Sequence, residues 1–284
     1  MPRASSETNL KAYDKPEVVA HYALLDSLTP CECLLFETYI RPGNHVLDLG
    51  VGGGRTTPYL ARRASRYVGV DYAPAMIEIC QAKFPGVEFK VADASDLSDF
   101  PDSSFDAVVF AFNGIDYVLP DQARRRCFEH ICRLLRPGGV LIFSSHNARA
   151  IFVRPSWNRE RLRRLAERLS HGSRTLCAVF FSVLVHVRIA LALLQAATGS
   201  VPRFIRRIPS MVFWRGEGNL VDPAHGGLLT HYSTPARMTD DLTALHLRFD
   251  RLLGHEYPQP SHRYSTDWYY YVFAKLGCDQ SDGR

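Results

Sequence analysis

Three aspartates and a run of glycines are the residues whose types and spacing point most directly to chemistry. In VLDLGVGGGRTTPYL at 46–60, Asp48 closes a short apolar run and glycines follow at positions 50, 52, 53 and 54. Glycines at such a turn let the backbone lie against a ligand, whose charged or polar groups meet the N–H groups at the start of the next helix. Asp71 and Asp93 end or follow two further apolar runs. The pattern predicts a ligand site where several strands end at one edge of a sheet.

The spacing of the glycines excludes a nicotinamide dinucleotide as that ligand. Its fingerprint needs glycines at positions 50, 52 and 55, but position 55 is Arg55, and a pattern that starts at Gly52 ends on Thr57. The carboxylate of Asp71 is placed to accept both ribose hydroxyls of an adenosine, and that of Asp93 to accept from an adenine amine. We therefore expect a ligand that contains adenosine.

The elements that must position these residues alternate along the chain between short apolar runs and helical patterns. The apolar runs predict buried strands at 45–49, 67–71, 87–91, 105–112 and 140–144, and two more follow a helix over 234–247, at 249–256 and 268–275. The turn at Pro137, Gly138 and Gly139 separates an amphipathic helix from the fifth strand. The fold class expected is α/β, a doubly wound seven-stranded sheet with a helical insertion between strands five and six.

The composition fits a globular chain with one strongly basic segment. The chain has 284 residues, 46% hydrophobic and 22% charged, which excludes disordered, collagen-like and coiled-coil classes. Residues 151–215 hold twelve arginines and two glutamates, which gives this segment a charge of +10. Because the net charge of the whole chain is +5, the other residues together carry −5. Such local concentration indicates a particular surface or partner rather than the overall charge of a nucleic-acid binder.

The cysteines and the first residues predict a compartment. The seven cysteines are an odd number, with no C-x-x-C pair and no histidines at ligand spacing. We expect reduced thiols, a cytoplasmic location and no metal site. Because MPRASSETNLKAYDKPE has no apolar core, no secretory signal is expected.

Residues 45–147 resemble the cofactor half of the class I S-adenosylmethionine-dependent methyltransferases. The resemblance is carried by VLDLGVGGG, VGVDYAPAMI, VADASDL and LLRPGGVLIF, and more faintly by the last two expected strands. It implies an enzyme that uses S-adenosylmethionine, and a sheet that is mostly parallel with a reversed last strand.

The resemblance also implies which residues bind the cofactor. Asp71 would hold the ribose, Asp93 and Ala94 would flank the adenine, and the backbone of Gly50 and Gly52 would face the methionine part. The full candidate set is Tyr13, Asp48, Gly50, Gly52, Gly54, Asp71, Tyr72, Met76, Asp93, Ala94 and Asn113. Tyr22 is a further candidate to cap the cofactor, with ordinary packing as the alternative.

Three residues are candidates for the acceptor side. Methyl transfer is an in-line displacement, so an alcohol or phenol acceptor must be aligned and must lose a proton. His146 follows the fifth strand at the correct edge for a general base, and a substrate hydrogen bond or a structural role are its alternatives. Asn113 ends the fourth strand, where its amide can contact the acceptor or simply form a turn, and His231 enters the same region after the insertion.

Three functions remain open at this stage. The first is methyl transfer to an O or N atom of a small-molecule acceptor, apolar or lipid-linked. The second is an RNA methyltransferase, which the arginines favour but the apolar helix among them disfavours; no DNA partner is expected. The third is a non-catalytic partner subunit that binds the cofactor.

The chain is expected to divide into four segments. Residues 1–44 form a tail and cap helices, 45–147 the cofactor core, 148–226 a helical insertion, and 227–284 the last helix and two strands. Within the insertion, 156–169 is a basic amphipathic helix and 176–194 is apolar almost all round. Two alternatives stay open for 156–194, a lid over the acceptor and a peripheral contact with a membrane surface.

Overall fold

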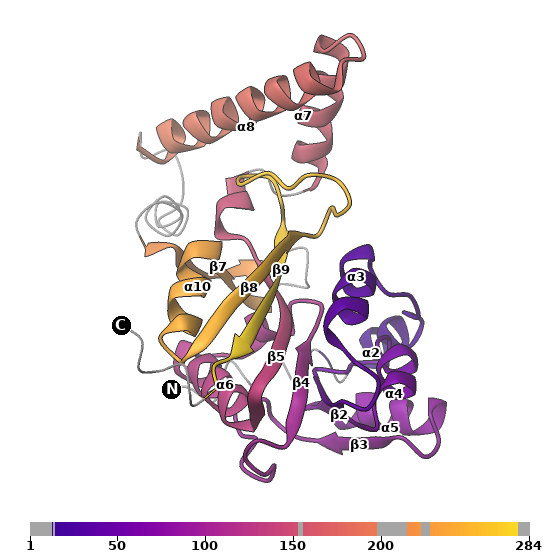
Figure 1. Cartoon of the computed structure of the whole chain (residues 1–284). Helices are drawn as coiled ribbons and strands as arrows, with labels where there is room; N and C mark the ends of the chain where they lie inside the picture. The colour runs from indigo at the N-terminus through magenta and orange to yellow at the C-terminus, as the bar shows by residue number, and fades with distance from the viewer. Residues whose placement is uncertain (1–12, 14, 153–155, 198–214, 223–227, 278–284) are drawn as a thin grey trace.

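A single seven-stranded sheet organises the chain, as the computed structural model in Figure 1 shows. The structure describes residues 13, 15–152, 156–197, 215–222 and 228–277. The strand order is β3-β2-β1-β4-β5-β9-β8. Its strands are β1 (His45–Leu49), β2 (Arg66–Asp71), β3 (Glu88–Val91), β4 (Phe105–Phe110), β5 (Leu135–His146), β8 (Leu247–Gly254) and β9 (Trp268–Lys275).

The direction of the strands confirms the expected fold class. Strands β1 to β5 pair in parallel, whereas β9 runs antiparallel to both β5 and β8. The last strand is therefore reversed, and the helical insertion follows the fifth strand. The order turns around between β1 and β4, and open sheets of this kind bind ligands outside the carboxyl ends of their strands at such a point.

Helices cover both faces of the sheet. Successive strand side chains point to opposite faces, and the side chains on both faces are apolar. On one face, α6 (Asp121–Leu134) and α10 (Pro235–Thr243) pack on side chains such as Val108 and Phe143. The strand residues adjacent in sequence, such as Val109 and Ile142, point to the other face. There they pack against α3 (Pro30–Tyr39), α4 (Thr57–Arg63) and α5 (Pro74–Lys83). The sheet is thus a rigid base for the loops at its edge.

A second, two-stranded sheet lies beyond the end of β5 and was not expected from the sequence. It pairs β6 (Glu217–Asp222) with β7 (Leu228–Ser233) in antiparallel register. A bridge between Asn147 and Ser233 joins it to the end of β5. The β6 sequence EGNLVD has neither the apolar run nor the alternation of a buried strand.

The helical insertion forms an arm that stands apart from the sheet (Figure 1). After the short helix η2 (Ala148–Phe152), it consists of α7 (Ser156–Leu169) and α8 (Arg174–Ala197), which pack on each other. One face of α8 rests on the loop between β8 and β9, where the Ser182 Oγ lies 3.2 Å from the His262 Nε2. Both helices match the expected ranges of the insertion.

By length and composition alone, α8 could also cross a membrane, and it is the one helix of the described residues for which this holds. The qualifying stretch is Arg174–Leu191, of which 11% is buried. Because so small a share of this stretch is buried, α8 differs from the core helix of a globular domain.

Candidate active site

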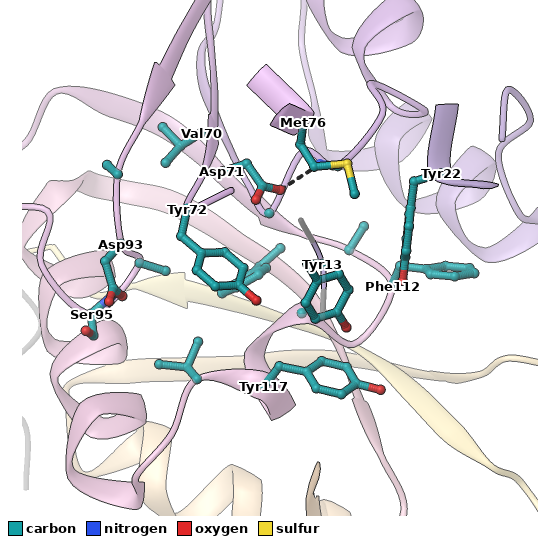
Figure 2. A pocket seen from close by; sticks show the side chains of 18 of the residues that line it. Tyr13, Tyr22, Val70, Asp71, Tyr72, Met76, Asp93, Ser95, Phe112 and Tyr117 are labelled. Carbon is teal, nitrogen blue, oxygen red and sulfur yellow. Dashed lines mark hydrogen bonds between the residues drawn. The ribbon is translucent and has the colours of Figure 1, made fainter. Parts of the chain in front are cut away.

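A deep pocket lies at the carboxyl ends of β1, β2 and β4, on the edge of the sheet that the sequence predicted. The space between its walls, together with the solvent at its open mouth, is about 920 Å³. Figure 2 shows how aromatic and acidic side chains converge on it. Its lining comprises Tyr13, Tyr22, Gly50, Gly52, Val70, Asp71, Tyr72, Met76, Ala92, Asp93, Ala94, Ser95, Phe110, Ala111, Phe112, Gly114, Tyr117, Val118 and Leu119.

The glycine loop after β1 forms one wall of this pocket. Gly50 and Gly52 have φ angles of +63° and +53°, in the left-handed region that glycine adopts without strain. A Cβ on the neighbouring Gly53 would stand 2.3 Å from the carbonyl oxygen of Tyr22, so the end of α2 (Pro16–Ala23) can approach the loop only because this residue is glycine. Gly54 does not line the pocket, and a Cβ on it would stand 2.5 Å from the Phe84 ring.

Asp48 lies beneath the glycine loop and fastens it. Its Oδ2 accepts hydrogen bonds from the hydroxyls of Thr56, at 2.5 Å, and Tyr67, at 2.9 Å. Burial raises the pKa of this carboxyl to about 6, although both hydrogen bonds act in the opposite direction. Asp48 lines a smaller hollow that shares Gly50 and Gly52 with the pocket.

Asp71 ends β2 and faces the pocket from the next strand. Its Oδ2 accepts from the Gly52 N–H at 2.9 Å and its Oδ1 from the Ala73 N–H at 3.0 Å. Burial raises the pKa of the carboxyl, and the backbone hydrogen bonds oppose this. Because a carboxylate offers about four acceptor positions, two remain for a ligand.

Asp93 and Ala94 form the far wall, just beyond β3. The Asp93 Oδ1 accepts from the Ser95 N–H at 2.8 Å, which holds the loop in a tight turn. The side chain of Asp93 is exposed and lines the pocket beside Ala94. The aspartates at the ends of β2 and β3 therefore reach one cavity, as their positions in the sequence predicted.

Four tyrosines enclose the pocket. The ring of Tyr13 lies 5.9–6.1 Å from the rings of Tyr22, Tyr72 and Tyr117. Burial raises the pKa of the Tyr13 and Tyr72 hydroxyls, so both are protonated at neutral pH. The buried hydroxyl of Tyr72 has no hydrogen-bond partner among the described residues. Since a buried hydroxyl normally finds a partner, a polar ligand atom would satisfy it.

Phe112 is a wall residue that sequence reasoning missed. It and Asn113 have φ angles of +56° and +62°, unusual for residues with a Cβ. The Arg55 guanidinium lies 4.9 Å from the centre of the Phe112 ring and is fixed in turn by Glu32, to which it donates at 2.5 and 2.6 Å. No local pattern marks Phe112, because its position depends on this contact with Arg55, which Glu32 of α3 holds in place.

His146 ends β5 and belongs to a buried hydrogen-bonded group behind the pocket wall. Its Nδ1 lies 2.7 Å from the Asp116 Oδ2, and its Nε2 lies 3.3 Å from the Asn113 Nδ2. Asp116 also accepts from the backbone N–H of His146 and from the Ser145 hydroxyl, each at 2.7 Å. A carboxylate on Nδ1 holds that nitrogen protonated and leaves Nε2 as the basic one.

Tyr117 separates this group from the pocket. Its ring lies 5.9 Å from that of Tyr13 and 6.4 Å from that of His146, which is only 1% exposed. Neither His146 nor Asn113 lines the pocket. Asp116, the partner of His146, lies in the loop that follows Asn113, and no sequence pattern marks it as that partner.

His231 on β7 is also buried near this group. Its Nδ1 lies 2.9 Å from the Asn219 Oδ1 on the paired strand, and its Nε2 lies 3.8 Å from the Glu217 Oε2. Burial lowers the pKa of the ring to about 3, with the Arg124 guanidinium as the next cause. His231 is therefore neutral at physiological pH, and it does not line the pocket.

The candidate cofactor residues are thus mostly brought together. Seven of them line the pocket with Tyr13: Gly50, Gly52, Asp71, Tyr72, Met76, Asp93 and Ala94. Asp48, Gly54 and Asn113 support its walls from behind. Among the described residues, no group of three histidines, cysteines or acids is arranged to hold a metal ion.

Comparison with known proteins agrees with this geometry. Residues 46–139 match a family described as "Methyltransferase domain". The chain is 36% identical over 103 residues to a demethylmenaquinone methyltransferase of Clavibacter sepedonicus, a match that covers 35% of this chain and 40% of the relative. It is also 36% identical over 121 residues to a fatty-acid O-methyltransferase of Mycolicibacterium smegmatis, covering 41% and 42%. The chain therefore spans less than half the length of these two curated relatives.

Solved structures share the whole fold. A 1,6-didemethyltoxoflavin-N1-methyltransferase of Burkholderia thailandensis, with bound 1,6-didemethyltoxoflavin and S-adenosylhomocysteine, aligns with a TM-score of 0.56 at 15% identity, over 96% of this chain and 87% of that one. A methyltransferase of Methanosarcina mazei aligns with a TM-score of 0.55 at 20% identity, over 89% and 99%. At such identities the likeness shows the fold.

The domain match and the fold point to one class of protein. Residues 46–139 are similar to the class I S-adenosylmethionine-dependent methyltransferases, whose fold the chain shares. The pocket fits that cofactor for two reasons. Asp71 keeps two acceptor positions for ribose hydroxyls, and the buried Tyr72 hydroxyl has no hydrogen-bond partner among the described residues.

Proposed function

We propose that this chain transfers a methyl group from S-adenosylmethionine to an O or N atom of a small-molecule acceptor that is apolar or lipid-linked. The observation that carries the proposal is the convergence of Asp71, Asp93 and the glycine loop on one aromatic pocket. When bound, the cofactor supplies a methyl group on a positively charged sulfur. The four-segment division of the chain and a cytoplasmic location are parts of the same proposal.

The residues of the pocket would bind and orient. Asp71 would hold the ribose hydroxyls with its two remaining acceptor positions, and Asp93 would accept from the adenine amine. The glycine loop brings its backbone close to the methionine part, and the Tyr72 hydroxyl would contact a polar ligand atom. Tyr13 and Tyr117 would exclude water and press an apolar acceptor toward the methyl group.

The choice of an apolar acceptor is supported by the remaining walls and by the relatives. Phe112, Val118 and Leu119 give the pocket an apolar side away from the aspartates. The matched relatives are named for demethylmenaquinone and for fatty acids, which are small apolar molecules. No residue of that wall offers the charge that a phosphate or sugar phosphate would need.

His146 is our candidate for the proton acceptor when the acceptor is an alcohol or phenol. Asp116 fixes its Nδ1, so its Nε2, which lies 3.3 Å from the Asn113 Nδ2, is the nitrogen that would receive the proton. Because Tyr117 stands between His146 and the pocket, the acceptor hydroxyl would reach Nε2 only when the Tyr117 ring turns aside. Asn113 would align the acceptor from the same side, and His231, being neutral, would at most donate or accept a hydrogen bond.

Transfer of a labelled methyl group tests this proposal. Wild type and Asp71→Ala would be incubated with methyl-labelled S-adenosylmethionine and a cell extract, and the products separated into organic-soluble, RNA and protein fractions. We expect label in an organic-soluble small product with wild type and little with the variant. Label in RNA would contradict the acceptor class, and cofactor binding without any labelled product would favour a non-catalytic partner subunit.

A further inference from the structure

The arm formed by α7 and α8 exposes a continuous apolar stripe. On α8, six side chains are 49–61% exposed: Leu176, Val179, Val183, Val187, Leu191 and Leu194. Their spacing of three or four residues places them on one side of the helix. A stripe of this length is unusual for a surface that meets only water.

The opposite side of α8 is the one that holds the arm to the protein. Val185 is fully buried and Ile189 is 6% exposed. The ring of Phe181 lies 5.7 Å from that of His262, and the ring of His186 lies 5.2 Å from that of Tyr264. The apolar stripe therefore faces outward, and no described residue of α7 or α8 lines the pocket. A lid over the acceptor would need the reverse orientation.

Exposed cations accompany the stripe on the neighbouring helix. Arg161, Arg164 and Arg168 share one side of α7 with the partly exposed Leu165 and Leu169, at spacings of three, four and seven residues. The side of α7 that contains the buried Ala166 is a different one. Over 156–197 the two helices hold seven arginines and two glutamates, so the arm is strongly cationic.

We propose that this arm docks on an anionic lipid surface, with the α8 stripe in the acyl boundary and the α7 arginines on the headgroups. Basic side chains beside an outward apolar helix face are what a helix lying in the membrane plane requires. The arm cannot cross the bilayer as a single span, because β5 precedes it in the chain, β8 and β9 follow it, and these strands belong to one sheet. This proposal is independent of the proposed function, since it concerns no residue of the pocket.

A second copy of the chain is a poorer occupant of the stripe. Six half-exposed aliphatic side chains offer roughly 200–400 Å² of apolar surface. A stable dimer needs roughly 800 Å² from each partner. Pairing two arms would also bring two clusters of arginines together, which costs free energy unless anions intervene.

Sedimentation with lipid vesicles, without cofactor or acceptor, tests the proposal. We expect wild type to bind vesicles that contain phosphatidylglycerol at low salt and to bind pure phosphatidylcholine vesicles much more weakly. The triple change Arg161→Gln, Arg164→Gln and Arg168→Gln should weaken binding about a hundredfold, because each cation near such a surface contributes about fivefold. High salt should have the same effect on wild type.

The stripe is tested by Val183→Asp with Val187→Asp, two exposed positions where the change does not disturb the core. We expect binding to fall about tenfold or more, because two carboxylates would enter the acyl boundary of an anionic surface. The matched controls are Val221→Asp, 63% exposed on β6, and Arg125→Gln, 75% exposed on α6, neither of which should alter binding. Melting curves would confirm that each variant is folded.

Three outcomes would overturn the proposal. The first is a wild type that fails to sediment with phosphatidylglycerol vesicles at low salt. The second is equal binding by wild type and the Val183→Asp, Val187→Asp variant. The third is a wild-type dimer in ultracentrifugation that this variant dissociates, which would assign the stripe to a second copy.

Discussion

Replacement of Asp71 by alanine perturbs a side chain that both holds the glycine loop and lines the pocket. In the structure its carboxylate accepts from the Gly52 and Ala73 N–H groups and has two acceptor positions left. Loss of hydrogen bonds from two ribose hydroxyls to a charged acceptor should cost about 1.5–3 kcal/mol of binding free energy. The dissociation constant for S-adenosylhomocysteine should therefore rise about 10- to 150-fold, measured by titration calorimetry.

The control for this change is Asp99→Ala, which removes an exposed aspartate outside the pocket. It should bind as wild type does, and melting curves should show that the Asp71 variant remains folded. Equal affinity of wild type and a folded Asp71→Ala protein would refute the reasoning, because the carboxylate would then make no contact with the ligand.

The same carboxylate predicts how binding depends on pH. Burial raises the pKa of Asp71 above the ordinary value of 3.8. Only the ionised form accepts from both hydroxyls, so affinity should fall as pH is lowered through the raised pKa and should be constant above it. An affinity that does not change between neutral pH and pH 4 would contradict this sign.

The remaining predictions concern residues behind the pocket wall. Because the pKa of Asp48 is raised to about 6, wild type should lose about 2 kcal/mol of unfolding free energy relative to Asp48→Asn as pH rises from 4 to 6. A difference in unfolding free energy between the two proteins that stays constant over this range, measured by denaturant titration, would contradict this. With a hydroxyl acceptor, His146→Ala should lower turnover about 10²- to 10⁴-fold with cofactor affinity unchanged, whereas unchanged turnover across pH 6–9 would remove His146 as the base. Asn113→Ala should lower turnover more than cofactor affinity, and equal losses in both would make the residue structural or cofactor-directed.

Much of the fold and of the cofactor pocket could be predicted because their signals are local. Each core strand is a short apolar run, and strand direction places Asp71 and Asp93 at one edge of the sheet. The glycines after β1 are needed for backbone conformation and close approach, so they too are visible in the sequence. The seven-stranded sheet with a reversed last strand was confirmed.

The rest depends on contacts between distant segments. Asp116 could not be recognised as the partner of His146, because GIDY has the appearance of a surface turn until η1 (Gly114–Tyr117) folds it beneath β5. Phe112 reaches the pocket through its left-handed backbone and through Arg55 and Glu32. The β6–β7 hairpin is likewise stabilised by its position beside η1 and β5 rather than by its own apolar pattern.

A crystal structure of the chain with S-adenosylhomocysteine would test the central claim most directly. We predict that the Asp71 carboxylate lies at hydrogen-bond distance, about 2.5–3.0 Å, from both ribose hydroxyls. The adenine should lie beside Asp93 and Ala94, and the sulfur should face the Tyr13 and Tyr117 side of the pocket. A ligand bound elsewhere, or bound here with Asp71 still turned only to the backbone, would contradict the account.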